Sequence, residues 1–564
     1  MRSNIAVLIV LSITAFGTSL TNALAAPPAI ESEAARVDQL FERWNRTTSP
    51  GCAMAIMKDG RILHKAGYGM ANLEHEAKIT PTTVFNVGSI AKQFTAAAIL
   101  MLAEEGKVSL DDPIRKYVPE LPDFGTPVTL RQMLRHTSGL RDYEQLLHFD
   151  GWRLDSPDLL TDGDIMHIMS LQKELNFPPG SNYSYSNTNY MLLAQVVSRV
   201  SKQSFHDFTM TRLFQPLGMK HTHFRVDHGE MIKNVAYAYI DKDGGGFDLC
   251  LPNYDTVGAT NLFTTVEDLA RWEENSYTGR VGGDKVIKQL HQPGKLSDGT
   301  PLNYAPGMFV GLGAEESGDA GDAGYRADIL RFPDDHFSVV TLCNLGSIDP
   351  MELSRKIADI YQGGKFSAAL SAATGPASSF HPDPKQLAAY AGAYVDKDEN
   401  LVLKFEQRGE SLWGESFTGP DAIGPAQLEA LSENRFRGVG VNEIDFGTDS
   451  NHRELTAKYL GMPSVQYRRV QDYKPTVAEL REFVGGYSSK ELDVPSYVTL
   501  VGEALVLYAP KMPEIALAPI ANDVFIGGDR HIHFTRDSQR RVSGLLMSGT
   551  WNRVQDLRFE RSSP

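Results

Sequence analysis

The last third of this sequence repeats itself, and the repeat restricts how that part of the chain can fold. Residues 387–394 (LAAYAGAY) match residues 480–487 (LREFVGGY) at an offset of 93 residues. After each match the chain continues as short alternating runs of apolar and polar residues broken by glycine and aspartate, which is typical of antiparallel strands. We therefore predict two β-barrel-like repeat domains, over residues 384–471 and residues 472–564.

The chain ahead of the repeat is long enough for a separate domain. Its 564 residues in total exceed what one hydrophobic core holds. Residues 363–383 are rich in glycine, alanine and serine and poor in large side chains, which indicates a linker. A positive charge, an apolar stretch and an Ala-Leu-Ala site predict a secretory signal peptide over residues 1–25. The remaining residues, 26–362, are expected to form the first domain.

The leader predicts an exported protein, periplasmic or extracellular. We find no other apolar run long enough to cross a bilayer, so a membrane-spanning protein is not expected. The net charge is −15, and loss of Arg2 with the leader makes it −16, which argues against nucleic acid as a partner. Cys52 and Cys343 lie in apolar, strand-like runs, so buried thiols are favoured over a disulfide.

Both ends of the first domain carry strand signals. Residues 52–57 and residues 61–68 are apolar runs on either side of Lys58-Asp59-Gly60, which predicts a β-hairpin. Later strands are predicted at residues 307–312, 325–332 and 337–343, with helices at residues 29–46 and 351–361. The segment between is mostly helical and looped. We therefore expect an antiparallel sheet flanked by helices plus an all-helical lobe, in a multidomain α+β protein.

A serine and a lysine stand one helical turn apart in the first domain. Ser89 and Lys92 begin an apolar helical run that ends near Gly106, a residue typical of a helix C-terminus. A helix that starts at Ser89 puts both side chains on one face and leaves the Ser89 N–H without an intrahelical partner. Such a hydroxyl is a nucleophile with half of an oxyanion hole. Ser170 and Lys173 have the same spacing, but nothing around them indicates a site.

A second polar group, Tyr185-Ser186-Asn187, lies where a loop enters a helix. A tyrosine at such a junction can hold its phenol near another site while Asn187 starts the helix. Taken alone, the segment is equally consistent with a packed ring and a simple helix cap.

Together these segments resemble the serine β-lactamase and penicillin-binding-protein superfamily, in particular its class C-like branch of esterases and D-aminopeptidases. The resemblance rests on Ser89-Ile90-Ala91-Lys92 and Tyr185-Ser186-Asn187. Supporting segments follow in the expected order at residues 129–140, 216–219 and 264–270. The resemblance covers roughly residues 33 to 361, and it implies a sheet flanked by helices with a site between the sheet and a helical lobe.

The resemblance also implies a role for each residue. Ser89 would be the acylated nucleophile, and Lys92 and Tyr185 would share its proton. Asn187 would orient the substrate and Lys92, and the N–H of Gly321 would complete the oxyanion hole. Because an ammonium close to a phenol favours the phenolate, Tyr185 is expected to act as a base near neutral pH.

One family motif is missing from this chain. In the family, Lys-Thr-Gly or His-x-Gly lies on a strand before a Gly-Tyr pair, and the basic side chain holds a substrate carboxylate. Here Gly318 takes that place, and no Lys or His occurs from residue 314 to residue 324. The acidic residues around it are Glu315, Glu316, Asp319 and Asp322. We therefore expect neutral esters or substrates with a free amino group to be preferred over penicillins and C-terminal D-Ala peptides. The alternative is a solvated loop whose acids point away from the site.

The sequence thus predicts an exported serine hydrolase that cleaves a small ester or a D-amino acid amide or peptide through an acyl-enzyme on Ser89. The alternative is a catalytically degenerate penicillin-binding-like protein that binds cell-wall peptides. A small ester, amide or peptide substrate is the expected partner, and no cofactor or metal is expected. Two histidine pairs lie on single strand faces without a carboxylate or cysteine nearby, so surface histidines are favoured over a metal site at His221/His223 and His531/His533.

Overall fold

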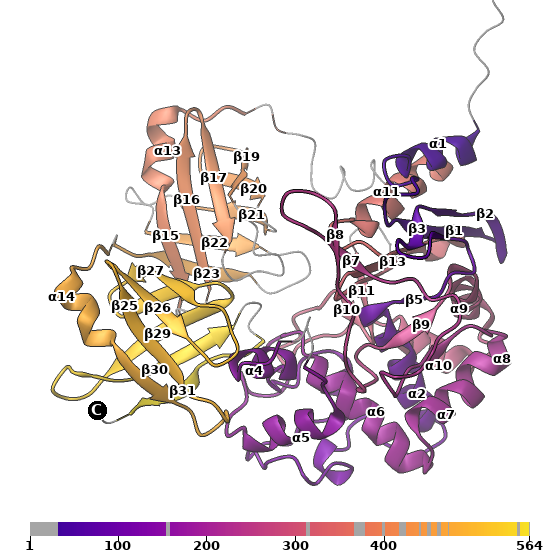
Figure 1. Cartoon of the computed structure of the whole chain (residues 1–564), viewed down its shortest axis with the longest axis horizontal. Coiled ribbons are helices and arrows are strands. Elements are labelled where there is room, and N and C mark those ends of the chain that lie inside the picture. The colour runs from indigo at the N-terminus through magenta and orange to yellow at the C-terminus, as the bar shows by residue number, and fades with distance from the viewer. Residues whose placement is uncertain are drawn as a thin grey trace, which may run out of the picture.

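The computed structural model describes residues 32–153, 158–311, 316–365, 378, 380–397, 401–416, 425–438, 441–447, 453–458, 464–471, 473–549 and 553–562. The predicted signal peptide and most of the predicted linker lie outside these residues. Figure 1 shows three units, a mixed unit of helices and strands followed by two β-rich units.

A seven-stranded sheet forms the centre of the first unit, in the order β10-β11-β12-β13-β14-β1-β2, with antiparallel pairing throughout. Its strands are β1 (Cys52–Lys58), β2 (Arg61–Tyr68), β10 (Tyr304–Ala305), β11 (Met308–Val310), β12 (Glu316–Asp322), β13 (Tyr325–Phe332) and β14 (Phe337–Cys343). The predicted hairpin and the predicted sheet built from both ends of the domain are confirmed. Strand β12 was not predicted from its pattern, because its sequence ESGDAGD has no apolar alternation.

Strand β1 is apolar along its length because both of its faces are buried. Alternate residues, such as Met54 and Ala55, belong to two hydrophobic clusters on opposite sides of the sheet. On one side of the sheet, helices α1 (Glu33–Leu40) and α11 (Pro350–Gln362) contribute to the hydrophobic cluster. On the other side, helices α2 (Ala91–Glu104) and α9 (Val266–Thr278) do so. Helix α1 is shorter at both ends than the predicted 29–46.

Cys52 and Cys343 are joined by a disulfide, so the expectation of unpaired thiols was wrong. The two residues face each other where β1 pairs with β14, and their Cα atoms are 4.0 Å apart. They lie 291 residues apart in the chain, and their apolar surroundings could not show that the two strands are neighbours. Cys250 is buried and does not take part in the disulfide.

The segment between the two ends of the sheet is mostly helical, as predicted, and lies below the sheet in Figure 1. Its helices are α3 (Leu130–Leu134), α4 (Tyr143–Phe149), α5 (Asp162–Leu171), α6 (Asn187–Ser201), α7 (Phe205–Thr209), α8 (Gln215–Leu217) and α10 (Gly283–Leu290). Its short strands are β3 (Met70–Asn72), β4 (Ala77–Lys78), β5 (Phe85–Asn86), β6 (His223–Phe224), β7 (Tyr239–Asp241), β8 (Phe247–Leu249) and β9 (Leu262–Thr264).

The two β-rich units share one plan, which confirms the predicted class of two barrel-like repeats. The first is a nine-stranded antiparallel sheet and the second is a closed antiparallel barrel. The elements of the first are α13 (Pro384–Tyr390), β15 (Gly392–Asp396), β16 (Val402–Arg408), β17 (Ser411–Ser416), β18 (Ala426–Gln427), β19 (Glu429–Ala430), β20 (Arg435–Gly438), β21 (Val441–Asp445), β22 (Glu454–Lys458) and β23 (Val465–Arg469). Those of the second are α14 (Val477–Leu480), β24 (Gly485–Ser488), β25 (Ser496–Val501), β26 (Ala504–Tyr508), β27 (Ile515–Ala521), β28 (Val524–Gly527), β29 (Arg530–Arg536), β30 (Val542–Gly549) and β31 (Leu557–Arg561).

Equivalent residues of the repeat make equivalent contacts. Tyr394 donates its hydroxyl to the carbonyl of Tyr390, and Tyr487 donates to the carbonyl of Phe483, in each case four residues back. His531, which was expected at the surface, is buried, with 2 % of its surface exposed. Among the described residues, no helix combines the length and the apolar character needed to cross a bilayer.

Candidate active site

Ser89 lies in a tight turn that leads into helix α2. Gly88–Ile90 form a 3₁₀ turn and α2 begins directly after it, two residues later than predicted. Because the turn continues into the helix, Lys92 still lies beside Ser89, three residues on. Gly88 has φ 48°, and a Cβ there would lie 3.2 Å from Ala320 Cβ. Strand β12 therefore fits closely against the turn that carries Ser89.

The hydroxyl of Ser89 contacts both of its expected partners. Lys92 Nζ lies 2.9 Å from Ser89 Oγ, and the Tyr185 hydroxyl donates to the same oxygen at 2.7 Å. Ser89 and Lys92 come from the start of α2, whereas Tyr185 comes from the loop ahead of α6. The structure therefore brings the three side chains together at one oxygen atom.

Lys92 is held by groups on three sides and is almost fully buried, with 1 % of its surface exposed. Its Nζ also donates to Asn187 Oδ1 and to the carbonyl oxygen of Ala259, both at 2.8 Å. Burial lowers the pKa of Lys92 to about 7, against the opposing effect of the Glu144 carboxylate. Near neutral pH a large share of Lys92 is therefore an uncharged amine that can accept a proton.

Tyr185 differs from the expectation of a phenolate. Burial raises the pKa of its hydroxyl above the usual range, although the hydrogen bond to Ser89 opposes this. Lys92 cannot supply the expected stabilisation, because the same burial favours its neutral amine. The structure therefore favours a protonated Tyr185 that donates to Ser89, and it makes Lys92 the group that can accept a proton.

His136 supports the loop that carries Tyr185. The two rings lie 4.4 Å apart between centroids, and His136 Nδ1 accepts from the main-chain N–H of Ser186 at 3.1 Å. The other ring nitrogen lies 3.1 Å from the hydroxyl of Tyr304. Burial holds the pKa of His136 well below its usual range, so the ring is neutral. These contacts give His136 a structural role, since it fixes the loop that carries Tyr185.

Strand β12 carries the segment in which the third family motif is missing. A Cβ on Gly318 would lie 2.6 Å from Gln93 Nε2, so a larger side chain requires Gln93 to move. Gln93 is itself fixed, because its Oε1 accepts a hydrogen bond from the buried indole of Trp272 at 3.0 Å. Gly321, three residues further along β12, lines the same cavity as Ser89. The strand thus lines the cavity beside Ser89 through Gly321, and a basic side chain at Gly318 would have to displace Gln93.

Of the four acidic residues expected near the missing motif, Asp322 is the one whose side chain the structure describes. Glu315 lies outside the described residues, and so do the side chains of Glu316 and Asp319. Asp322 lines the cavity and accepts hydrogen bonds from Asn86 Nδ2 and from the hydroxyls of Tyr254 and Thr260. The alternative in which the acids point away from the site is therefore wrong for Asp322.

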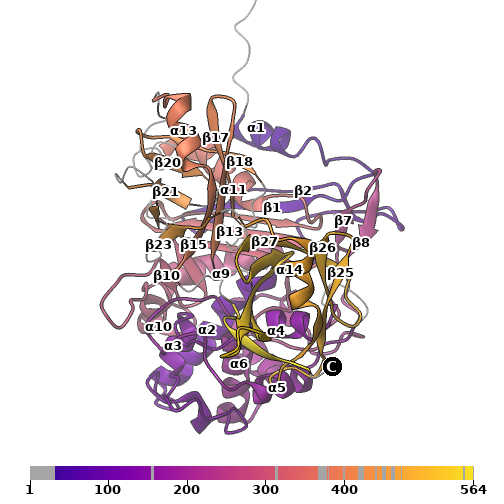
Figure 2. The same ribbon diagram turned by 90° about the vertical axis from the view of Figure 1, so that its left-hand side faces the viewer.

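A cavity of about 690 Å³ opens in front of Ser89, and its walls come from three parts of the chain. Helix α4 and strand β12 form two of the walls. The second barrel forms the third wall with Lys511, Met512, Pro513 and Arg553. Figure 1 and Figure 2 both show this barrel, in yellow, beside α4. A domain that the sequence separates from Ser89 by more than 380 residues thus reaches the candidate site.

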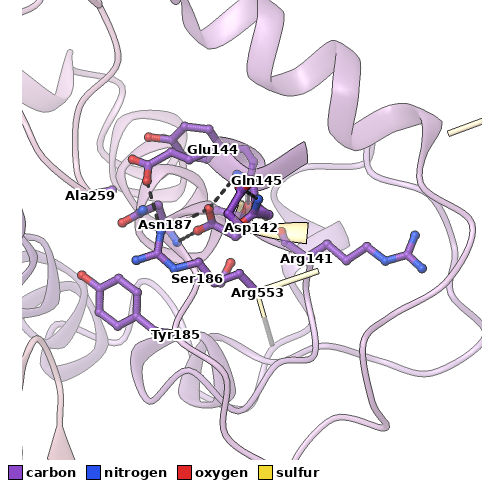
Figure 3. Close-up of polar contacts among 12 residues, drawn as sticks. Arg141, Asp142, Glu144, Gln145, Tyr185, Ser186, Asn187, Ala259 and Arg553 are labelled. Carbon is purple, nitrogen blue, oxygen red and sulfur yellow. Dashed lines mark hydrogen bonds and ion pairs between the residues drawn. The ribbon is translucent and has the colours of Figure 1, made fainter. Parts of the chain in front are cut away.

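Arg553 brings a cation into the site from the second barrel. Its guanidinium carbon lies 5.3 Å from the centroid of the Tyr185 ring, and Nη1 lies 3.3 Å from Glu144 Oε2 and 3.8 Å from Asp142 Oδ1. Asp142 Oδ2 in turn accepts from the main-chain N–H of Asn187 at 2.5 Å. Figure 3 shows these residues gathered around Asn187. The cluster is therefore connected to the residue that holds Lys92.

Sequence reasoning missed Asp142, Glu144 and Arg553. The two acids follow directly after residues 129–140, a segment that supported the resemblance, but they match no motif of their own. Arg553 belongs to a repeat that the sequence presents as a separate domain. No signal in the sequence showed that the loop containing Arg553 packs against α4.

Comparison with known proteins agrees with this architecture. A family model described as Beta-lactamase matches residues 37–362, more than half of the chain. The D-aminopeptidase of Gluconobacter oxydans is 28% identical over 461 residues, which cover 79% of this chain and 81% of that protein. The D-aminopeptidase of Brucella anthropi is 24% identical over 529 residues, which cover 89% of this chain and 94% of that protein.

Solved structures show the same fold. The octameric penicillin-binding protein homologue from Pyrococcus abyssi superposes with a TM-score of 0.54 at 22% identity, and the match covers 77% of this chain and 99% of that chain. Because the family model matches more than half of the chain and Ser89, Lys92 and Tyr185 meet in one site, the chain belongs to the β-lactamase family and is a serine hydrolase of the β-lactamase-related type.

Proposed function

We propose that this chain is an exported hydrolase that cleaves a D-amino acid amide, a short peptide or a small ester through an acyl-enzyme on Ser89. The observation that carries the proposal is the hydrogen-bonded group of Ser89, Lys92 and Tyr185 at the wall of a cavity of about 690 Å³. A nucleophile, a group able to accept its proton and a group able to donate one are the parts that acyl transfer requires.

In the acylation step, the neutral amine of Lys92 accepts the hydroxyl proton while Ser89 Oγ attacks the substrate carbonyl carbon. The new C–O bond moves an electron pair to the carbonyl oxygen, and the N–H groups of Ser89 and Gly321 hold the resulting oxyanion. As the intermediate collapses, Tyr185 gives its proton to the leaving amine or alkoxide, and Lys92 returns a proton to Tyr185. Asn187 holds Lys92 in line throughout.

Deacylation follows the same route with water as the nucleophile. Water attacks the acyl carbon, its proton passes to Lys92, the released Ser89 Oγ regains a proton from Tyr185, and Lys92 returns a proton to Tyr185. The proton that leaves with the leaving group in acylation is thus replaced by one from water in deacylation, and the three side chains return to their starting state.

Two observations support a D-amino acyl substrate. The relatives from Gluconobacter oxydans and Brucella anthropi are D-aminopeptidases. The carboxylates of Asp322 and Glu144 line the cavity together with the cations of Arg153, Lys511 and Arg553, and a carboxylate beside the bound substrate favours a substrate ammonium. The Cys52–Cys343 disulfide supports export, since disulfides persist mainly in oxidising compartments.

Replacement of Ser89 by alanine tests the proposal, and Ser170→Ala is the matched control. Ser170 has the same spacing to a lysine, but it lies exposed on α5 and donates to the carbonyl of His167 at 2.7 Å. With D-amino acid p-nitroanilides and p-nitrophenyl esters, we expect Ser89→Ala to lose several orders of magnitude in kcat and Ser170→Ala to stay within a factor of two. Mass spectrometry should find a fluorophosphonate adduct on Ser89.

The opposite results identify the alternatives. Activity that survives Ser89→Ala and is lost in Ser170→Ala would place the nucleophile on α5. A protein that binds cell-wall peptides but neither turns over these substrates nor reacts with the probe would be the non-catalytic binder.

A further inference from the structure

We propose that Glu144 binds the free ammonium group of the substrate and that Arg553, supplied by the second barrel, is the positioning residue that directs the Glu144 carboxylate toward the cavity. The inference rests on the proposed hydrolysis at Ser89 and adds the recognition of the amine. No family motif carries either residue.

Glu144 lies in the first turn of α4 and lines the cavity together with Ser89 and Asn187. Its side chain is 33 % exposed, so one side of the carboxylate is open to the cavity. On the other side Arg553 Nη1 lies 3.3 Å from Oε2. The guanidinium thus holds one oxygen of the carboxylate, and both side chains line the cavity. Figure 3 shows Glu144 and Arg553 close together beside Asn187.

The charges of the cluster leave room for one more cation. Asp142 and Glu144 contribute two carboxylates, and Arg553 contributes one guanidinium within 3.8 Å of both. Asp142 is fully buried and is engaged by the main-chain N–H groups of Gln145 and Asn187. Within this cluster the carboxylates outnumber the guanidinium by one, and Glu144 is the carboxylate that lines the cavity, where an ammonium group can make a charge-assisted hydrogen bond. Arg153 and Lys511 line the same cavity, and Arg153 is already paired with Asp158.

Asp322 is the other carboxylate at the cavity wall, and its contacts give it a different role. Three donors converge on its Oδ2, from Asn86, Tyr254 and Thr260. Such a carboxylate is already stabilised by hydrogen bonds and ties β12 to neighbouring loops. Glu144 instead faces a single side-chain cation, which makes it the better partner for an incoming ammonium.

Arg553 can act as a positioning residue because its loop is fixed on the catalytic domain. The carbonyl oxygen of Arg553 accepts from the N–H of Asp142 and from Asn176 Nδ2, both at 2.9 Å. Two residues on, the N–H of Gln555 donates to Asn176 Oδ1 at 2.8 Å. The loop therefore holds Arg553 at a defined distance from α4.

The charged groups around Glu144 predict how pH affects the amine preference. Burial raises the pKa of Glu144 to about 7, Asp142 and Asp322 add to the rise, and Arg553 and Lys92 oppose it. His148 lies one turn further along the same helix. Removal of the Arg553 charge should therefore raise the pKa of Glu144 further. As pH falls, the carboxylate would then become protonated at a higher pH than in the wild type, and the site would lose its amine preference at that higher pH.

The test compares two substrates that differ only in the amino group, D-phenylalanine p-nitroanilide and 3-phenylpropanoyl p-nitroanilide. The measured quantity is the kcat/KM of the amine-bearing substrate divided by the kcat/KM of the substrate without the amine, between pH 6 and pH 9. We expect Glu144→Gln to lower this ratio about 10- to 100-fold, because a charge-assisted hydrogen bond is lost. Arg553→Gln should move to higher pH the midpoint at which this ratio changes. Arg553→Lys should bring that midpoint most of the way back to its wild-type pH.

Arg541→Gln is the matched control, since it removes an exposed cation of the same barrel that pairs with Asp537 and does not line the cavity, and it should leave the midpoint unchanged. Binding of D-phenylalaninamide and 3-phenylpropanamide to the Ser89→Ala protein, measured by calorimetry, repeats the comparison without turnover. Thermal unfolding of every variant identifies loss of folding.

The outcomes separate the inference from the proposed function. An unchanged ratio in Glu144→Gln, or a ratio that only Asp322→Asn lowers, overturns the assignment of Glu144. A ratio that falls in Arg553→Gln without a shift of the pH midpoint overturns the positioning role. A wild-type protein that turns over neither substrate and is not labelled at Ser89 refutes the proposed function instead.

Discussion

Replacement of Glu491 by alanine tests how firmly the second barrel is attached to the catalytic domain. Glu491 Oε2 lies 2.7 Å from Arg141 Nη1, and the two side chains are 8 % and 1 % exposed. Arg141 also donates to Gln172 Oε1 at 3.1 Å and to the carbonyl of Gln555 at 3.0 Å. The ion pair therefore joins the start of α4 to the barrel that carries Arg553.

The size of the effect follows from the burial of the pair. Removal of one partner leaves the other charge buried without its counter-ion, which costs about 3–5 kcal/mol. For a domain the size of this barrel, 1 kcal/mol corresponds to roughly 4–8 °C in Tm. The barrel transition should therefore fall by at least about 12 °C in Glu491→Ala and in Arg141→Ala. The double replacement Arg141→Met with Glu491→Leu removes both charges, and we expect it to be more stable than either single variant.

Scanning calorimetry of the full chain is the assay, combined with the substrate ratio that reports the amine preference. We expect both single variants to show an early barrel transition and a reduced amine preference, because Arg553 loses its fixed position. Single-variant shifts below about 3 °C would show that the pair contributes little to docking. A double variant less stable than both singles would refute the argument from the unpaired charge.

Four further predictions concern the catalytic domain. Because burial lowers the pKa of Lys92 to about 7 and the neutral amine is the base, kcat/KM for a neutral ester should rise as pH rises through about 7, and Lys92→Met should abolish the rise. Tyr185→Phe should lower kcat about 10²- to 10⁴-fold with little change in KM in steady-state assays, because it keeps the ring and removes one proton-transfer group. Cys343→Ser should destabilise the protein by about 2–5 kcal/mol in thermal unfolding, and reductant should lower the Tm of the wild type but not of the variant. Gly318→Lys should cost about 1–3 kcal/mol by displacing Gln93, and a carboxylate-bearing ester should gain nothing in kcat/KM over its amide.

Local features of the site could be predicted from the sequence because they depend on spacing within one element. Ser89 and Lys92 are three residues apart at the start of a helix, so their contact needs only the geometry of one turn. The short apolar run of β1, followed by the turn at Lys58-Asp59-Gly60, similarly predicts a strand without reference to the rest of the fold. Tyr185 lies 96 residues from Ser89, and the resemblance to a known family, rather than the spacing, indicated that the two meet.

Features that depend on the meeting of distant segments could not be predicted. Cys52 and Cys343 each lie in an apolar strand, and only the pairing of β1 with β14 places the two sulfur atoms together. The pKa of Tyr185 was misjudged because the sequence shows a nearby lysine but not the burial that removes the lysine's charge. In both cases the missing information is the three-dimensional environment of a correctly located residue.

The replacement of the third-motif cation illustrates how the environment changes the chemistry. Strand β12 has Gly318 at the place of the family's cation, and a lysine there would have to displace the Gln93 side chain. Arg553 enters the site from the opposite side, but Asp142 and Glu144 balance its charge. A cation with two carboxylates beside it cannot attract a substrate carboxylate as an isolated lysine would, because the cluster as a whole is negative. The same barrel that brings a positive side chain into the site thus favours an ammonium group on the substrate, and this is why we expect the chain to select amines although an arginine lies beside Tyr185.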